Sequence, residues 1–361
     1  EEQGSHLILP DTIEEVAATI GRTDYNYIFL VYGATEQLET NYVSSQRREE
    51  IRQSYPLSLL PIAHITPGDT GVRGVVFSMT NHPSRFSGEE LEEILRTVRT
   101  FADALGAGPI GLGGQIPSIL NLRRLRRDHS YVMGAFGSVH TVMATVEAVR
   151  EIEGIAPENL TVGVNGVGFL GRRVSRYMRD LGYQVVGYEP AATRDIQGIG
   201  MLLTGNREAL TQCGIVLNLA PQGDDLGGIL PYLQEGVVVI DDTHPRPSDS
   251  TIRAVLQKGR LYWAGMKKTG VLITPSFPGR HEEEIPGCAL ETILRAMGSS
   301  IPSQSVLNTL AQDHNFDVSP RELDKGLFLG RVKLRGRLKG VGWMGGSLPL
   351  KIFSVLWGSL E

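Results

Sequence analysis

The sequence predicts an α/β fold in which a doubly wound parallel sheet occupies the middle of the chain. Short apolar runs typical of buried strands alternate with helical segments between residues 160 and 264, and this alternation is typical of a parallel sheet. The 361 residues are 41% hydrophobic and 21% charged, a composition typical of folded globular proteins. The length is sufficient for more than one domain.

The strongest local pattern lies in the middle of the chain. Leu160–Val164 reads as a short buried strand, Leu170–Leu181 has helical periodicity, and Gln184–Tyr188 reads as a second strand. Between them stands a G-x-G-x-x-G turn formed by Gly166, Val167, Gly168, Phe169, Leu170 and Gly171. This order is typical of a Rossmann dinucleotide-binding domain, in which the turn and the helix N-terminus hold the pyrophosphate. The sequence therefore predicts NADH or NADPH as the cofactor.

The residue after the second strand bears on which of the two is bound. Glu189 stands where an acid accepts hydrogen bonds from the adenosine ribose and repels a 2′-phosphate, which favours NADH. Arg194 can instead pair with a 2′-phosphate, so NADPH stays open. Ala220 and Pro221 follow the strand Ile215–Leu219 and are expected to contact the cofactor too.

Further elements complete the predicted architecture. The expected strands are Tyr27–Tyr32, Val237–Ile240 and Leu261–Ala264, and the expected helices or loops are Gly88–Leu105, Ser138–Glu153 with Ser138 as N-cap, Asn206–Thr211 and Ser248–Lys258. Ile110–Leu120 reads as a glycine-containing turn. The predicted domains are an amino-terminal α/β substrate domain (1–155), the Rossmann domain (156–275), a helical segment carrying Cys288 (276–325), and a basic and apolar tail (326–361).

Charge and cysteine content exclude several classes of protein. A net charge of −5 gives no overall footprint for nucleic acid, and no apolar run is long enough to predict stable membrane insertion. The first residues do not resemble a signal peptide. Two cysteines cannot form a disulfide scaffold, and no residues show metal-ligand spacing, so we expect a cytoplasmic protein without a metal.

Cys288 is the candidate nucleophile. It lies in the first turn of an expected helix, Pro286–Met297, where the helix dipole favours the thiolate. A lone helix cysteine can equally be a small buried hydrophobic residue. Cys213 precedes a strand, has no acid or base near it in sequence, and is interpreted as structural.

Several separated motifs occur in the order found in one enzyme family. These are Ile110-Gly-Leu-Gly-Gly114 followed by Ser118, Gly137-Ser-Val-His-Thr141, Pro221-Gln-Gly223, Ile240-Asp241 with Pro245, and Pro286-Gly-Cys-Ala-Leu-Glu-Thr292. Through them the chain resembles the cyanobacterial long-chain acyl-[acyl-carrier-protein] reductases, which form aldehydes. The similarity covers roughly residues 25–320. Ser138 stands where the family has Asn, and Glu189 and Pro190 stand where it has an Arg.

The resemblance implies a function and roles for individual residues. It implies NAD(P)H-dependent reduction of an acyl or aminoacyl thioester, on an acyl or peptidyl carrier protein or on coenzyme A, to an aldehyde. Cys288 would carry the acyl group, His140 would donate a proton or orient the carbonyl, and Gly114, Ser118, Gly137 and Ser138 would contact the substrate. Two further histidines are candidates because of their positions in the sequence. His281, seven residues before Cys288, can act as a base toward the thiol, and His244, in the loop after a strand, lies where such sheets bind ligands. The cluster Arg123, Arg124, Arg126 and Arg127 can dock an acidic carrier or can be a solvated face.

Two other functions remain open. One is an amino- or hydroxy-acid dehydrogenase in which Cys288 has no covalent role, and the other is a non-catalytic module that senses a dinucleotide. The sequence does not predict the oligomeric state.

Overall fold

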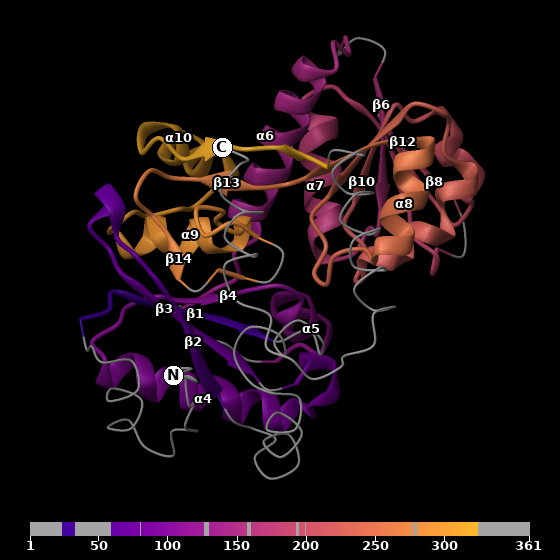
Figure 1. The fold of residues 1–361 in the computed structure, drawn as a ribbon. Helices are drawn as coiled ribbons and strands as arrows, with labels where there is room; N and C mark the ends of the chain where they lie inside the picture. The colour runs from indigo at the N-terminus through magenta and orange to yellow at the C-terminus, as the bar shows by residue number, and fades with distance from the viewer. Residues whose placement is uncertain are drawn as a thin grey trace, which may run out of the picture. The chain divides into compact units, whose positions relative to one another are not determined.

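The computed structural model describes residues 24–32, 59–79, 81–125, 130–156, 160–192, 195–198, 200–274, 276–277 and 280–323. Arg126, Arg127, Arg194 and the predicted tail 326–361 lie outside these residues. All elements named below belong to one compact unit, Glu1–Glu322. The predicted α/β class is confirmed, because two largely parallel sheets carry helices on their faces (Figure 1).

The larger sheet has the doubly wound order. Its central strands are parallel and run in the order β12, β11, β10, β6, β7, β9. Their bounds are β6 Thr161–Asn165, β7 Gln184–Tyr188, β9 Met201–Thr204, β10 Ile215–Asn218, β11 Val237–Asp241 and β12 Gly259–Trp263. The antiparallel edges are β8 (Ile196–Gly198) and β16 (Arg321–Glu322). The strand order reverses between β6 and β10, which is where sheets of this kind bind ligands.

Helices of the predicted periodicity cover this sheet. They are α6 (Ala135–Ile152), α7 (Phe169–Asp180) and α8 (Asp249–Lys258). Val142 and Val146 of α6 and Val174 of α7 are fully buried against the strands, in a core that also contains Val162 and Val164. The expected segment Asn206–Thr211 is the 3₁₀ helix η4 (Arg207–Gln212).

The smaller sheet has the order β14, β2, β3, β1, β4, β5. The bounds are β1 Tyr27–Tyr32, β2 Leu59–Ile65, β3 Gly74–Met79, β4 Ile110–Leu112, β5 Tyr131–Val132 and β14 Ile273–Thr274. Strands β1, β3, β4 and β5 are parallel, whereas β2 and β14 are antiparallel to their neighbours. Strand β14 therefore joins the smaller sheet although it follows all the parallel strands of the larger one in sequence.

Helices lie on both faces of the smaller sheet (Figure 1). Alternate residues of β1 explain this, because successive strand side chains point to opposite faces. Ile28 and Leu30 share a core with α4 (Gly88–Ala104), whereas Tyr27 and Phe29 share one with α9 (Gly287–Ala296). Helix α9 and its Cys288 are thereby fixed to the smaller sheet.

The shorter elements connect these layers. They are η1 Gly68–Thr70, η2 Pro83–Arg85, α5 Ile116–Leu122, η5 Gly223–Gly228, η6 Leu230–Tyr232, α10 Gln304–Asp313, and the strand pair β13 Met266–Lys267 and β15 Asp317–Val318. Within the described residues, no helix is both long enough and apolar enough to cross a membrane.

One predicted helix start is wrong. Helix α6 begins at Ala135 rather than after Ser138, and its N-cap is Gly134, whose φ of 63° is left-handed. The side chain that satisfies this end comes from another helix, since the Phe136 N–H donates to Glu291 Oε2 at 3.2 Å. Ser138 consequently lies within the helix.

Candidate functional site

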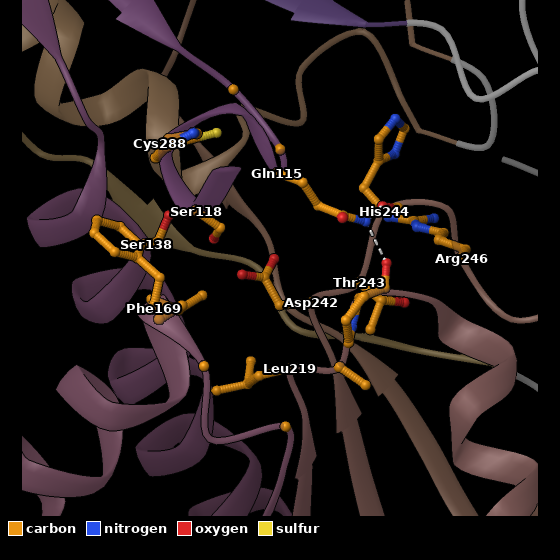
Figure 2. Close-up of a pocket in the computed structure, with 18 of the residues that line it drawn as sticks. Gln115, Ser118, Ser138, Phe169, Leu219, Asp242, Thr243, His244, Arg246 and Cys288 are labelled. Atoms are coloured by element: carbon orange, nitrogen blue, oxygen red, sulfur yellow. Dashed lines mark hydrogen bonds between the residues drawn. The ribbon is translucent and has the colours of Figure 1, made fainter. Parts of the chain in front are cut away.

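A single cavity of about 740 Å³ contains most of the predicted site residues. Its walls come from the carboxyl ends of β6, β7, β10 and β11, from β1 of the smaller sheet, and from the first turns of α6, α7 and α9 (Figure 2). The cavity therefore lies at the edge of the larger sheet where the strand order predicts a ligand.

The glycine turn has the shape that a dinucleotide requires. Gly166 has a φ of 91°, and a Cβ there would approach the Ala220 backbone to 2.7 Å, so no other residue fits. Gly168 lines the cavity with no atom within 4 Å of its Cβ position, which leaves room for a pyrophosphate at the start of α7. A Cβ at Gly171 would clash with the Gly166 carbonyl oxygen. These residues fit the predicted cofactor.

The predicted cofactor residues divide into those that line the cavity and those that do not. Those that line the cavity are Gly166, Gly168, Phe169, Leu170, Glu189, Ala220 and Pro221. Val167, which is 1% exposed, packs in the core, and Gly171 packs against the turn itself; neither lines the cavity. Their contribution is to hold the shape of the turn.

An acidic and a basic side chain line the cavity beyond the carboxyl end of β7. Glu189 lines it, as predicted, and so does Arg207, whose Nε donates to the Tyr188 hydroxyl at 2.9 Å. Arg207 and Tyr188 also line an adjoining cavity of about 340 Å³. Sequence reasoning missed Arg207 because it follows β9, a strand that the apolar pattern did not predict.

Cys288 lies at the second position of α9 and lines the cavity. The prediction that it stands in the first turn of a helix is confirmed. Burial nevertheless raises the pKa of its thiol to about 11, although the Gly114 backbone N–H stabilises the thiolate. At this helix start, loss of hydration therefore outweighs the backbone hydrogen bonds that favour the thiolate.

Glycines bring the first turns of α6 and α9 together around Cys288. A Cβ at Gly134 would approach the Cys288 Cβ to 2.6 Å, and one at Gly287 would approach Thr141 Oγ1 to 2.6 Å. A Cβ at Gly137 would clash with the Gly287 carbonyl oxygen. Two helix N-termini, with their backbone N–H groups, thus meet beside the thiol.

Only some of the remaining predicted substrate and catalytic residues line the cavity. Gly114, Ser118 and Ser138 line the cavity, whereas Gly137 and His140 do not. His140 Nδ1 is 2.9 Å from Asn308 Oδ1, and burial lowers the pKa of its imidazole. His140 stands on α6 in contact with α10 rather than at the cavity wall.

A group of ionisable residues on the loop after β11 also lines the cavity: Asp242, His244, Arg246 and, from a separate segment, Arg280. Burial raises the pKa of Asp242 to about 7 and lowers that of His244 to about 4. Arg246 pairs with Glu284 at 2.9 Å, and Arg280 pairs with the same carboxylate. The sequence singled out His244 but missed Asp242, whose only signal was its place directly after a strand.

Asp241, one residue earlier, has a different role. Its carboxylate accepts hydrogen bonds from Asn218 Nδ2 at 2.7 Å and from the Thr243 hydroxyl at 2.9 Å. Asn218 in turn accepts from Asn165 Nδ2 at 2.8 Å. This buried chain of polar groups links the ends of β6, β10 and β11 and fixes the loops that follow them.

Three other expectations concern residues outside the cavity. Cys213 is buried, and burial raises the pKa of its thiol to about 12. His281 is exposed, and its Nδ1 accepts from the Glu283 N–H at 3.4 Å. Arg123 donates to the backbone oxygens of Ser84, at 3.1 Å, and Phe86, so its guanidinium is engaged locally.

No family model and no curated protein matches the chain. Among solved structures, shikimate 5-dehydrogenase from Thermus thermophilus is similar over 80% of this chain and 99% of its own, at 12% identity and a TM-score of 0.39. TP0037 from Treponema pallidum, a D-lactate dehydrogenase, shows 15% identity, coverages of 64% and 76%, and a TM-score of 0.29. A glyoxylate/hydroxypyruvate reductase from Sinorhizobium meliloti shows 16% identity and a TM-score of 0.27. The match to this reductase covers 37% of this chain and 61% of the reductase. At these scores the likenesses carry no argument about the reaction.

Proposed function

We propose that the chain is an NAD(P)H-dependent oxidoreductase that reduces an acyl thioester to an aldehyde through an acyl group carried on Cys288. The observation that carries the proposal is the common cavity: Cys288 and the glycine turn residues Gly166 and Gly168 line the same space. A nucleophile and a dinucleotide site that share one cavity can perform acyl transfer followed by reduction.

The surroundings of Cys288 suit acyl transfer. Attack of the thiol on a thioester carbonyl develops negative charge on the carbonyl oxygen, and donors positioned for that oxygen lower the barrier. The first turns of α6 and α9 bring backbone N–H groups to this part of the cavity, and Ser138 adds a hydroxyl. Phe29, Val31, Ile62, Met133 and Phe277 provide an apolar wall for the acyl chain.

The cofactor would be held by the glycine turn and the start of α7. When bound, NAD(P)H supplies the hydride that reduces the acyl group. The protein would hold the acyl group on Cys288 until the hydride is delivered, in a cavity that Cys288 shares with the glycine turn. The substrate would be a thioester of coenzyme A or of a carrier protein, as the resemblance to the acyl-carrier-protein reductases implies.

A second candidate is an NAD(P)-dependent dehydrogenase of hydroxy or amino acids without covalent catalysis. Two observations favour it. The raised pKa of the Cys288 thiol opposes nucleophilic attack, and the guanidinium groups of Arg246 and Arg280, which share the single carboxylate of Glu284, line the same cavity, where a substrate carboxylate would also pair with them. In this function Cys288 would only line the wall.

Turnover assays distinguish the two candidates. Purified protein is supplied with NADH or NADPH and a panel of acyl-coenzyme A thioesters, and in parallel with NAD⁺ or NADP⁺ and a panel of 2-hydroxy and 2-amino acids. The proposed function predicts aldehyde from a thioester and none in Cys288→Ala. Oxidation of a hydroxy or amino acid at equal rates in the parent and in Cys288→Ala would establish the second candidate instead.

A further inference from the structure

We infer that Asp242 is a catalytic residue that moves the proton between the Cys288 sulfur and the thiol that leaves the substrate. The inference rests on the proposed function and gives a role to a residue for which the resemblance implies none. His140, the residue expected to transfer protons, does not line the cavity, so proton transfer at Cys288 requires another residue.

The position of Asp242 is the first argument. Asp242 directly follows β11, at the carboxyl end of the strand, and its side chain lines the cavity. Figure 2 shows its carboxyl group pointing into the cavity, with Cys288 and Ser138 on one side and Leu219, after β10, on the other. A substrate carbonyl at Cys288 and a ligand on the glycine turn would both approach this carboxyl group.

The contrast with Asp241 is the second argument. The Asp241 carboxylate is held by Asn218 and Thr243, which orient it within the sheet edge. Asp242, by contrast, uses its backbone N–H to donate to the Asn218 carbonyl oxygen at 3.2 Å, and its side chain is directed to the cavity. The first acid of the pair therefore positions the loop, and the second is presented to the cavity.

The charges around Asp242 leave it able to exchange a proton near neutral pH. Burial raises its pKa, the charge of Asp241 and Glu284 raises it further, and the guanidinium groups of Arg280 and Arg246 lower it. Cys288 lies close enough that the Asp242 charge raises the pKa of the thiol. His244, whose pKa burial lowers to about 4, is neutral at pH 7. A carboxyl with a pKa near 7 is suited to both acid and base roles.

The proton balance is simple. As the Cys288 sulfur forms its bond to the acyl carbon, the thiol proton passes to the Asp242 carboxylate. The bond between the acyl carbon and the substrate sulfur then breaks, and Asp242 returns the proton to the leaving thiolate. Acylation thus leaves Asp242 ionised as at the start, and no oxidation or reduction occurs in this step.

The test compares acylation by two thioesters in the parent and in Asp242→Asn, by rapid quench and mass spectrometry without reductant. One is decanoyl-coenzyme A, whose alkyl thiolate needs a proton to leave, and the other is the phenyl thioester of decanoic acid, whose aryl thiolate leaves without one. Removal of the Cys288 proton precedes acylation by either ester, so acylation by both esters should slow in Asp242→Asn. The loss should be about 100-fold or more with the coenzyme A ester and smaller with the phenyl ester, whose leaving thiolate needs no proton. Equal losses with both esters, or no loss with either, would overturn the transfer of one proton between the two sulfurs.

Iodoacetamide alkylation of Cys288 provides a readout that is independent of turnover. Removing the negative charge of Asp242 should shift the pH midpoint of alkylation to a lower value, so the thiol becomes more reactive while acylation slows. A residue that only supports the structure would not move these two properties in opposite directions. An unchanged midpoint would contradict the placement of Asp242 beside the thiol.

The control is Glu282→Gln, which neutralises an exposed acid outside the cavity. It should behave like the parent in both assays. A parent protein that forms no adduct with either ester would overturn the proposed function. A parent that is acylated, together with an Asp242→Asn variant acylated at the same rate, would overturn only the inference about Asp242.

Discussion

At the scale of single residues, burial decides the chemistry of this site more than position in a helix does. Cys288 stands at a helix start, yet burial raises the pKa of its thiol to about 11. The dipole at a helix end contributes about 0.3–1 kcal/mol, less than one pKa unit, which corresponds to about 1.4 kcal/mol. A thiol in such a site therefore needs a proton acceptor to react at neutral pH.

The ionisation of Asp242 should be visible in the stability of the protein. The pKa of this carboxyl is about 7 in the folded protein and that of an unfolded Asp is about 3.9. Because the unfolded chain loses this proton first, Asp242 lowers stability progressively as pH rises from about 4 to about 7. The side chain in Asp242→Asn cannot ionise. The difference in melting temperature between this variant and the parent should therefore be larger at pH 8 than at pH 4.5, and the increase should be about 2 °C or more. Thermal unfolding in the two buffers measures this, and an equal difference at both pH values would contradict it.

Glu189 and Arg207 should set the choice of dinucleotide. Both line the far end of the cavity, and the acid disfavours a 2′-phosphate whereas the guanidinium favours it. Exposed charge pairs contribute about 0.2–1 kcal/mol, so each change should alter affinity by up to about fivefold. Glu189→Ala should strengthen NADPH binding and leave NADH nearly unchanged, and Arg207→Ala should weaken NADPH binding. Fluorescence titration measures both, and parallel changes for the two cofactors would argue against this site.

At the scale of the elements, the meeting of α6 and α9 depends on glycine. A Cβ at Gly137 would clash with the backbone oxygen of Gly287, and backbone atoms cannot move aside as a flexible side chain can. Gly137→Ala should therefore destabilise the protein by about 1–3 kcal/mol, the usual cost of overpacking.

The matched control for this substitution is Gly227→Ala, at a position where nothing lies within 4 Å of a Cβ. Denaturant unfolding of the two variants compares their free energies of unfolding. A Gly137→Ala protein as stable as Gly227→Ala would show that the helix ends are not tightly packed.

The elements that could be predicted from sequence are those whose residues carry a local pattern. Strand β7 and the glycine turn with α7 were predicted almost to the residue, because apolar runs and glycines report on local conformation. Strands β2 and β3 and the short strand β14 were not predicted. Strand β14 has two residues and exists only because β2 lies beside it. The start of α6 was misplaced because its capping carboxylate, Glu291, is remote in sequence.

At the scale of the whole molecule, the cavity forms because two sheets contribute to it. The Gln115 side chain donates to the Pro221 carbonyl oxygen at 2.5 Å, and the Tyr32 hydroxyl donates to the His244 carbonyl oxygen at 3.3 Å. These bonds join segments of the smaller sheet to loops at the carboxyl edge of the larger one. Sequence patterns could identify Cys288 and the glycine turn separately, but only the tertiary fold places Asp242 in the cavity with both of them.

The central claim is that Cys288 carries the acyl group, and mass spectrometry after incubation with an acyl thioester, without reductant, tests it most directly. The account predicts a mass increase of one acyl group on the peptide containing Cys288, its discharge as aldehyde when NADH or NADPH is added, and no adduct in Cys288→Ala. Cys213 is buried away from the cavity, so Cys213→Ala should be acylated like the parent. A parent protein that turns over a thioester while Cys288 stays unmodified, together with full activity in Cys288→Ala, would contradict the account.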